Sequence, residues 1–182
     1  MKFIRSVLVL SFLLLFAVIP EYAVAASADE LARDAQNSLS RLVDSSSKAL
    51  RLANDAKAVL VFPSIVKAGF LVGGQFGEGV LLRDGKPAGY YNTVAISYGL
   101  QIGAQKYGYA LFFMTDEAMK YLDKSDGWEL GTAPSIVVLD SGAAGGITTT
   151  TTQSDMYAFF FSQKGLMAGL GLQGTKITKI EK

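Results

Sequence analysis

The sequence predicts an α+β protein in which N-terminal helices pack on a glycine-rich, mostly antiparallel β-sheet or barrel, with one short additional helix. Two observations lead to this class. Apolar residues recur at helical spacing in residues 29–57 and at strand spacing from residue 58 onward, and residues 66–82 contain five glycines among alternating apolar residues. Short strands, tight turns and few intervening helices favour antiparallel pairing, and closure into a barrel stays open as an alternative.

The helical pattern predicts two helices. Four apolar residues follow one another at spacings of four, four and three, which places them on one helical face: Leu31, Ala35, Leu39 and Leu42. The three serines at 45–47 are expected to end this helix and to cap a second one, running from about residue 48 to residue 56, with Leu50 and Ala53 facing inward.

Strand patterns begin at residue 58. Residues 58–62 are a β-branched and aromatic run that Pro63 is expected to stop, and Asp84-Gly85 predicts a hairpin turn because this pair tolerates positive φ angles. Residues 100–105 alternate as a half-buried strand, with Leu100, Ile102 and Ala104 as the apolar side and Gln105 on the other. A further strand is expected at 109–114.

The C-terminal third predicts the short helix and the remaining strands. Thr115 is expected to cap a helix over 116–123, and residues 135–139 form a strand. Residues 141–155 are rich in glycine, threonine and serine, and their first half is expected to be a loop. Strands at 157–161 and 166–172 are expected to be joined by a hairpin at 162–165. The glycines of 66–82 and 165–171 leave one strand face bare, which lets another backbone approach closely or lets the sheet bend.

Residues 1–25 have the features of a secretory signal. Two basic residues precede an apolar run of about 13 residues, and Ala23-Val24-Ala25 forms a small-x-small cleavage pattern. The run is shorter than the roughly 20 residues that a membrane-spanning helix needs. We therefore expect cleavage after Ala25, one mature domain over 26–182, and a periplasmic or secreted location, with an uncleaved anchor as the alternative. The sequence has no cysteine, so neither a thiol-linked lipid nor a disulfide is expected.

The charge balance argues against a nucleic-acid partner. The signal would remove two of the 17 basic residues and one of the 16 acidic ones, which leaves the mature chain without net charge. A neutral protein has no overall field that attracts a polyanion. Affinity for an anionic surface would have to come from a local patch.

The composition also argues against catalysis. With no histidine and no cysteine, the usual base near neutral pH, the thiol nucleophiles and the common zinc ligand sets are missing, so we expect no enzyme, no metal and no cofactor. The glycine pattern at 169–174 matches a dinucleotide-binding motif, but only eight residues follow it, too few for the helix and strand that motif needs. A hydrolase built on paired carboxylates stays open, because the scattered carboxylates could meet in space; these are Glu78, Asp116, Asp140 and Asp155.

Basic residues in and after the helical region are the candidate lipid contacts. They follow one another at spacings that could place several on one side, where they could contact lipid phosphates. The candidates are Arg41, Lys48, Arg51, Lys57 and Lys67. Because Asp44 and Asp55 lie among them, an ordinary solvated face of mixed charge is the alternative.

Several blocks, in order, resemble the SYLF domain family. They comprise residues 56–63, the segment 67–70 with the glycine-rich hairpin 74–82, residues 99–105, the Trp128-Glu129-Leu130-Gly131 segment and residues 162–169. The resemblance spans roughly residue 31 to the C-terminus. It departs from the family at 89–95, where a tryptophan-containing segment is common, and in the helix at 29–43, which is not basic.

The resemblance implies a lipid-binding, non-enzymatic protein. Eukaryotic members of the family bind phosphoinositides, some also bind actin, and bacterial members are typically exported. Because the helix at 29–43 is not basic, phosphoinositide and actin binding are not carried over. We therefore expect an exported envelope protein that binds an anionic lipid or membrane surface; a protein-interaction or structural module of the envelope, with a protein partner, is the alternative.

Overall fold

The computed structural model describes residues 26–123, 128–129, 135–140, 154–165 and 174–182, which form an α+β fold as expected. The expected signal segment, the Gly/Thr-rich stretch at 141–153 and the expected strand at 166–172 lie outside these residues. In chain order the elements are α2 (Ala28–Ser45), α3 (Ser47–Asp55), β1 (Ala58–Arg83), β2 (Lys86–Phe113), α4 (Asp116–Leu122), β3 (Trp128–Glu129), β4 (Ile136–Asp140), β5 (Met156–Gly165) and β6 (Lys176–Ile180).

Short polar residues begin all three helices. Ser27 and Glu30 form a capping box at the start of α2, where each side chain accepts a hydrogen bond from the other residue's backbone N–H. Ser46 caps α3, which confirms that the serines at 45–47 separate two helices. Thr115 caps α4 by accepting from the backbone N–H of Ala118, also as expected.

β1 and β2 form one long antiparallel hairpin of 26 and 28 residues. The turn is the expected one, with φ of 50° at Asp84 and 72° at Gly85. The expected strand end at Pro63 is wrong, because β1 continues through it to Arg83. The pairing with β2 is interrupted between Phe62 and Ile65, so this proline lies at an irregularity where a missing N–H is tolerated.

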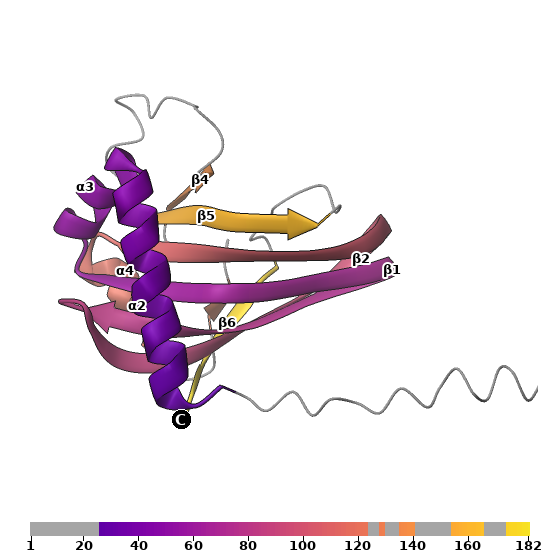
Figure 1. Ribbon diagram of the computed structural model, residues 1–182, viewed down its shortest axis with the longest axis horizontal. Helices are drawn as coiled ribbons and strands as arrows, with labels where there is room; N and C mark the ends of the chain where they lie inside the picture. Colours follow the sequence, from indigo (N-terminus) through magenta and orange to yellow (C-terminus); the bar gives the residue numbers. More distant parts are fainter. Residues whose placement is uncertain (1–25, 124–127, 130–134, 141–153, 166–173) are drawn as a thin grey trace, which may run out of the picture.

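The hairpin bends so that the two halves of β1 pack against each other. A Cβ added at Gly79 would lie 2.7 Å from the carbonyl oxygen of Val61, and one added at Gly77 would lie 2.8 Å from that of Ser64. Residues 72–83 therefore lie close beside residues 58–69, and α2 crosses both (Figure 1). Close backbone approach, which the sequence predicted for these glycines, is confirmed at Gly77 and Gly79 but not at Gly74, where the nearest atom would be 3.8 Å away.

The strands form a single six-stranded sheet in the order β3-β6-β2-β5-β4, with β1 paired to β2. Its pairing is mostly antiparallel as expected, and β4 alone pairs in parallel, with β5. Within the described residues the sheet is open, so the barrel alternative is wrong. The expected hairpin at 162–165 is wrong too: β5 runs on to Gly165, and Ser162 lies at a bulge with φ 54° opposite an interruption in the β2 pairing.

The folded sheet has an apolar interior and an apolar outer face. The interior cluster includes Phe62, Tyr109 and Phe160, together with one face of α4. The outer cluster joins α2 and α3 to both halves of β1, through residues such as Leu42 and Val80. Figure 1 shows α2 lying across the strands, with α3 at one end of the molecule and the bend of β1 and β2 at the other.

The C-terminus returns to the start of α2 (Figure 1). The ammonium of Lys182 donates to the backbone oxygen of Ala26 and lies 2.8 Å from the Glu78 carboxylate, an ion pair with side chains only 10% and 20% exposed. Lys182 therefore links β1 to the residues that precede α2. None of the helices in the described ranges has the length and apolar character required to cross a bilayer.

Candidate functional site

The short helix α3 separates two hollows at the helical end of the molecule. One lies between α2, α3 and the sheet and is called here the α2–α3 groove. The other lies on the opposite side of α3, against Met114 and Tyr157, and is called the Arg51 hollow. Their volumes are about 490 and 450 Å³, within the roughly 300–1,000 Å³ typical of small-molecule sites.

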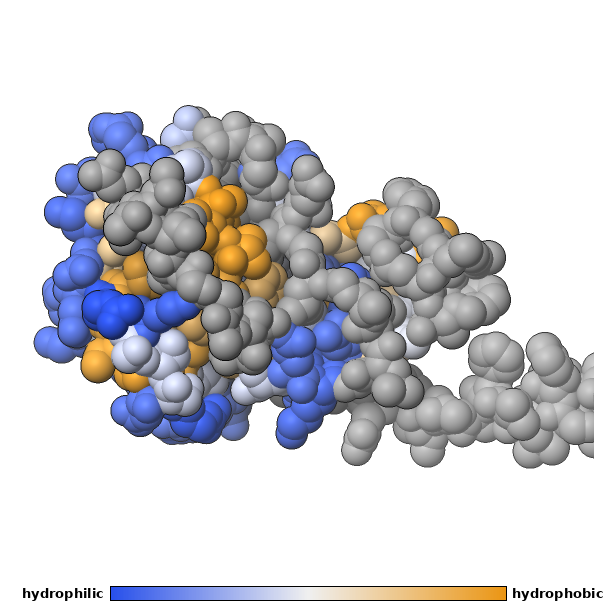
Figure 2. All heavy atoms as spheres, turned by 90° about the horizontal axis from the view of Figure 1, so that it is seen from above, coloured by the Kyte–Doolittle hydropathy of each residue, from blue (hydrophilic) through white to orange (hydrophobic). Residues whose placement is uncertain are grey.

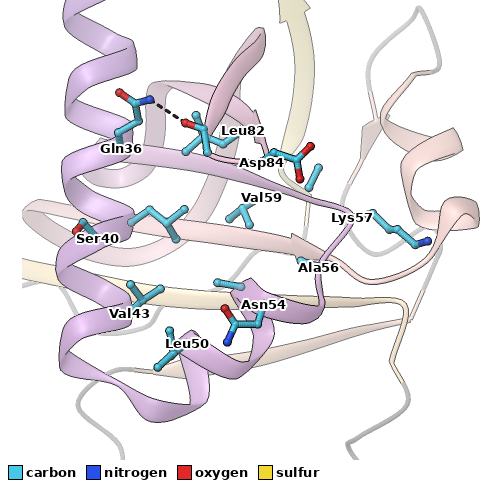
Figure 3. A pocket seen from close by; sticks show the side chains of 14 residues that line it. Gln36, Ser40, Val43, Leu50, Asn54, Ala56, Lys57, Val59, Leu82 and Asp84 are labelled. Carbon is cyan, nitrogen blue, oxygen red and sulfur yellow. Dashed lines mark hydrogen bonds between the residues drawn. The ribbon is translucent and has the colours of Figure 1, made fainter.

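The α2–α3 groove has apolar walls and a polar rim. Its apolar walls come from Leu39, Val43, Leu50, Ala53, Val59 and Leu82. At one end the side-chain amide of Gln36 donates to the backbone oxygen of Gly85 at 2.8 Å, which ties α2 to the hairpin turn (Figure 3). Ser40, Asn54 and Asp84 complete the rim. This arrangement suits an extended apolar group with a polar end.

The Arg51 hollow combines two cations with apolar surface. Lys48 and Arg51 project from the same side of α3, and the hollow is completed by Leu52, Asp55, Met114, Ser154 and Tyr157. Arg51 is exposed, and no ion pair involving it is found among the described residues. With one carboxylate against two cations, the hollow keeps an excess of positive charge beside apolar side chains.

The structure brings together only some of the predicted basic residues. Lys48 and Arg51 share the Arg51 hollow. Lys57 borders the α2–α3 groove but points away from it (Figure 3), and its ammonium lies 3.9 Å from the Asp116 carboxylate in an exposed pair. Such pairs contribute about 0–1 kcal/mol. Arg41 lines neither hollow and donates to the hydroxyl of Ser38.

Lys67 does not belong to this surface. It is only 9% exposed and pairs across the ladder with the buried Gln105, so its side chain faces the interior of the folded sheet. Its burial argues against the prediction that Lys67 contacts lipid phosphates. Successive side chains of a strand point to opposite faces of the sheet. A shift of one residue along the strand therefore decides whether a side chain lies at the surface or in the interior.

A buried polar layer lies in the interior of the folded sheet. Tyr107 donates its phenol hydrogen to Gln75 at 2.8 Å, and the amide of Gln75 donates to Thr175 at 3.2 Å. Gln105 is 6% exposed, and its side-chain oxygen has no hydrogen-bond partner in the part of the chain that the structure describes. The expected alternation at 100–105 is thus reversed where side chains are described, since Gln105 is buried and Ala104 is exposed.

Burial sets the protonation of the phenols in this layer. Burial raises the pKa of Tyr107 to about 12. Burial also raises the pKa of Tyr109, and the effect outweighs the opposing hydrogen bond from its hydroxyl to Thr93, 3.0 Å long. Both tyrosines are therefore neutral hydrogen-bond donors at physiological pH.

The carboxylates considered for catalysis have separate partners. Glu78 contacts Lys182, Asp116 contacts Lys57, and Asp155 accepts hydrogen bonds from the hydroxyls of Thr115 and Ser135. The Asp155 carboxylate thus links Thr115, which caps α4, to Ser135, which precedes β4. These contacts give Asp155 a structural role. The side chain of Asp140 lies outside the described residues.

Sequence reasoning missed both hollows. It identified Lys48 and Arg51 from helical spacing, but no sequence signal shows that Met114 and Tyr157, more than 60 residues later, lie beside them. The exposure of Leu50, at 46%, was missed as well, because the residue was expected to face inward. An apolar residue between two cations on a nine-residue helix is the signal that could have indicated it.

The C-terminal half of the chain matches a known protein family. Residues 94–182 match the family model described as Ysc84, Las17-binding protein actin regulator. This match confirms the SYLF resemblance over that part of the chain. The search of curated proteins finds no match to the chain.

Proposed function

Residues 94–182 carry the sequence pattern of the Ysc84 family, and from this premise we propose that the protein is an exported, non-catalytic envelope protein that binds anionic lipid at a membrane surface. The contact is made by α3, through Lys48, Leu50 and Arg51. The observation that carries the proposal is the exposure of Leu50 at 46% on the same short helix as two cations.

This surface has the chemistry of an interfacial helix. Such helices place apolar side chains at the boundary of the acyl chains while basic side chains contact the phosphates. The carboxylate of Asp55 lowers the net charge of the hollow but leaves one positive charge in excess. Because the mature chain has no net charge, this local excess, rather than the field of the whole protein, supports binding.

The α2–α3 groove gives the surface room for a lipid tail. Leu50 lies at its edge, so a lipid whose phosphate contacts α3 could lay an acyl chain along Leu39, Val43 and Val59. The groove would then contribute apolar burial, at about 25 cal/mol per Å² removed from water. Its polar rim, with Ser40 and Asn54, would face the glycerol region.

Vesicle co-sedimentation of a charge-reversal variant tests the proposal. Lys48→Glu/Arg51→Glu is compared with Arg33→Glu/Lys179→Glu, which makes the same change of net charge at exposed positions outside both hollows. A basic residue near an anionic surface contributes about 1 kcal/mol, so loss of two predicts at least about 30-fold weaker binding. Equal weakening in both variants would show that net charge alone governs binding and would refute the α3 contact.

A protein-interaction role is the second candidate, and one observation favours it. β4 is a terminal strand of the sheet order and exposes Val138 at 52%. Unpaired strand edges accept an added strand from a partner. Crosslinking from a photoreactive residue at Val138 would recover one reproducible partner if this role is correct, and would recover none if it is not.

A further inference from the structure

The outer face of the hairpin near its bend carries an apolar patch. Four large apolar side chains there are exposed by 42–65%: Val72, Phe76, Val94 and Ile96. The β1–β2 register places them together, since Phe76 pairs with Val94 and Gly74 pairs with Ile96. They are called here the hairpin-end patch. Figure 2 shows hydrophobic side chains at this end of the molecule, away from the helices.

The same face is covered where the helices reach it. Val80 and Leu82 lie further along β1 on this face and are 0% and 2% exposed, because they pack in the outer cluster with α2. Glu78, between them and Phe76, is held by Lys182. Among the described residues, the side chains that α2 and Lys182 cover on this face end at residue 78, and the four patch residues continue the apolar face beyond it.

Lysines flank the patch on both halves of the bent hairpin. Lys176 pairs directly with Val94 across the β2–β6 ladder, and Glu129 lies opposite it on β3. On the other half, the exposed Val66 lies in a row with Lys106 and Lys164, both exposed. Glu78 forms an ion pair with Lys182. The other exposed charged residues that the structure describes on this face are three basic ones, Lys106, Lys164 and Lys176, and one acidic one, Glu129.

An apolar centre with a cationic border fits an anionic bilayer better than a second copy of the chain. Contiguous exposed apolar patches mark contact sites for proteins or membranes. In a symmetric dimer the same face meets itself, which would bring the row of Lys106 and Lys164 near its own copy. A bilayer instead offers acyl chains to the apolar centre and phosphates to the lysines.

We propose that the hairpin-end patch is a membrane-docking surface whose apolar side chains enter the headgroup–acyl boundary of an anionic bilayer. It is separate from the α3 contact and does not depend on it. Gly77, the neighbour of Phe76, lies against Ser64 and Ile65, and Val72 lies near the bend. At about 3.3 Å per residue the patch therefore extends from roughly 20 to roughly 40 Å from the start of β1, next to α3.

The absence of cysteine from the chain allows a single-site probe. Gly74 lies beside Ile96 in the patch, and a Cβ there has its nearest neighbour 3.8 Å away, so Gly74→Cys can carry an environment-sensitive fluorophore. Asn37→Cys, exposed on α2, is the matched control. With vesicles of phosphatidylglycerol and phosphatidylcholine, the residue 74 label is expected to shift to the blue and to be quenched by brominated acyl chains, and the residue 37 label is not.

A second pair of variants measures the apolar contribution. Phe76→Ser/Ile96→Ser is expected to weaken vesicle binding by about 100-fold or more, because the two side chains together lose burial worth roughly 3 kcal/mol. Val138→Ser, a change at a similarly exposed side chain on β4, is expected to leave binding unchanged. Thermal melting confirms that all variants fold.

Three outcomes overturn the proposal. One is the absence of any residue 74 response with vesicles that bind the protein, and another is equal loss of binding in Val138→Ser. The third is a lipid-free blue shift that grows with protein concentration, which would make the patch a contact between two copies. In the Lys48→Glu/Arg51→Glu background the residue 74 response is expected to persist, so failure of the α3 contact and failure of this patch give different results.

Discussion

Adding one methyl group at Gly79 is expected to destabilise the fold, because the two halves of β1 leave no room for it. The new Cβ would lie 2.6 Å from the Phe62 ring and 2.7 Å from the Val61 carbonyl oxygen. One of these neighbours is backbone, so the strain cannot be relieved by a side-chain rotation alone. Gly79→Ala therefore shifts one half of the bent hairpin away from the other.

The size of the effect follows from overpacking. Inserting a methyl group into a packed core costs roughly 1–3 kcal/mol, and contact with backbone places Gly79→Ala in the upper part of that range, about 2–3 kcal/mol. Gly74→Ala is the control, because its Cβ would have 3.8 Å to the nearest atom. Alanine there removes glycine's excess unfolded-state freedom and is expected to stabilise by about 0.5–1 kcal/mol.

Thermal and urea unfolding distinguish the two variants. For a domain of this size 1 kcal/mol moves Tm by about 2–4 °C, so Gly79→Ala is expected to lower Tm by roughly 4–12 °C. Gly74→Ala is expected to raise it by about 1–4 °C. If the two substitutions changed Tm in the same direction and by similar amounts, the close packing of residues 72–83 against residues 58–69 would be refuted.

The remaining stability predictions concern a cap, an ion pair and a buried phenol. Thr115→Ala removes the α4 cap and its bond to Asp155, and is expected to cost about 1–2 kcal/mol in urea unfolding; an unchanged midpoint would contradict it. Lys182→Met leaves the Glu78 carboxylate largely buried without its cation, and is expected to cost about 2–3 kcal/mol, whereas a surface pair would cost less than 1. The Tyr107 pKa of about 12 lies above the unfolded value near 10. The unfolded chain therefore loses this proton first, so the free energy of unfolding is expected to fall as pH rises from 10 to 12 and to fall less steeply in Tyr107→Phe.

Local signals in the sequence predicted the helices and the hairpin turn. Ser46 and Thr115 could be recognised because a cap needs only a short side-chain oxygen and the next few backbone N–H groups. Asp84 and Gly85 could be recognised because their positive φ angles are a property of the pair itself. In each case the interacting atoms lie within a few residues of one another.

The strand ends could not be predicted in the same way. Pro63 and Ser162 were interpreted as breaks, but each lies at an irregularity inside a strand that continues. Whether such a residue ends a strand or bulges it depends on the neighbouring strand, which is distant in sequence. Strand β6 was not predicted, for a related reason: its pairing partners at 90–94 on β2 lie more than 80 residues earlier in the sequence.

The candidate site was predicted only in part. The spacing of Lys48 and Arg51 on a helix correctly placed them together, because helix geometry alone sets their directions. Lys67 was misplaced because its direction depends on which face of β1 turns inward after the bend. The apolar walls of both hollows come from elements far apart in sequence, so they emerge only from the tertiary fold.

Binding to anionic vesicles across a range of salt concentrations measures whether the protein binds anionic lipid and how much of the binding is electrostatic. The protein is expected to sediment with phosphatidylglycerol-containing vesicles at low salt, and binding is expected to weaken as salt is raised, because the phosphate contacts of α3 are exposed and screened. A salt-resistant remainder would measure the apolar contribution of Leu50 and the hairpin-end patch. No retention on anionic vesicles at the lowest salt would contradict lipid binding itself.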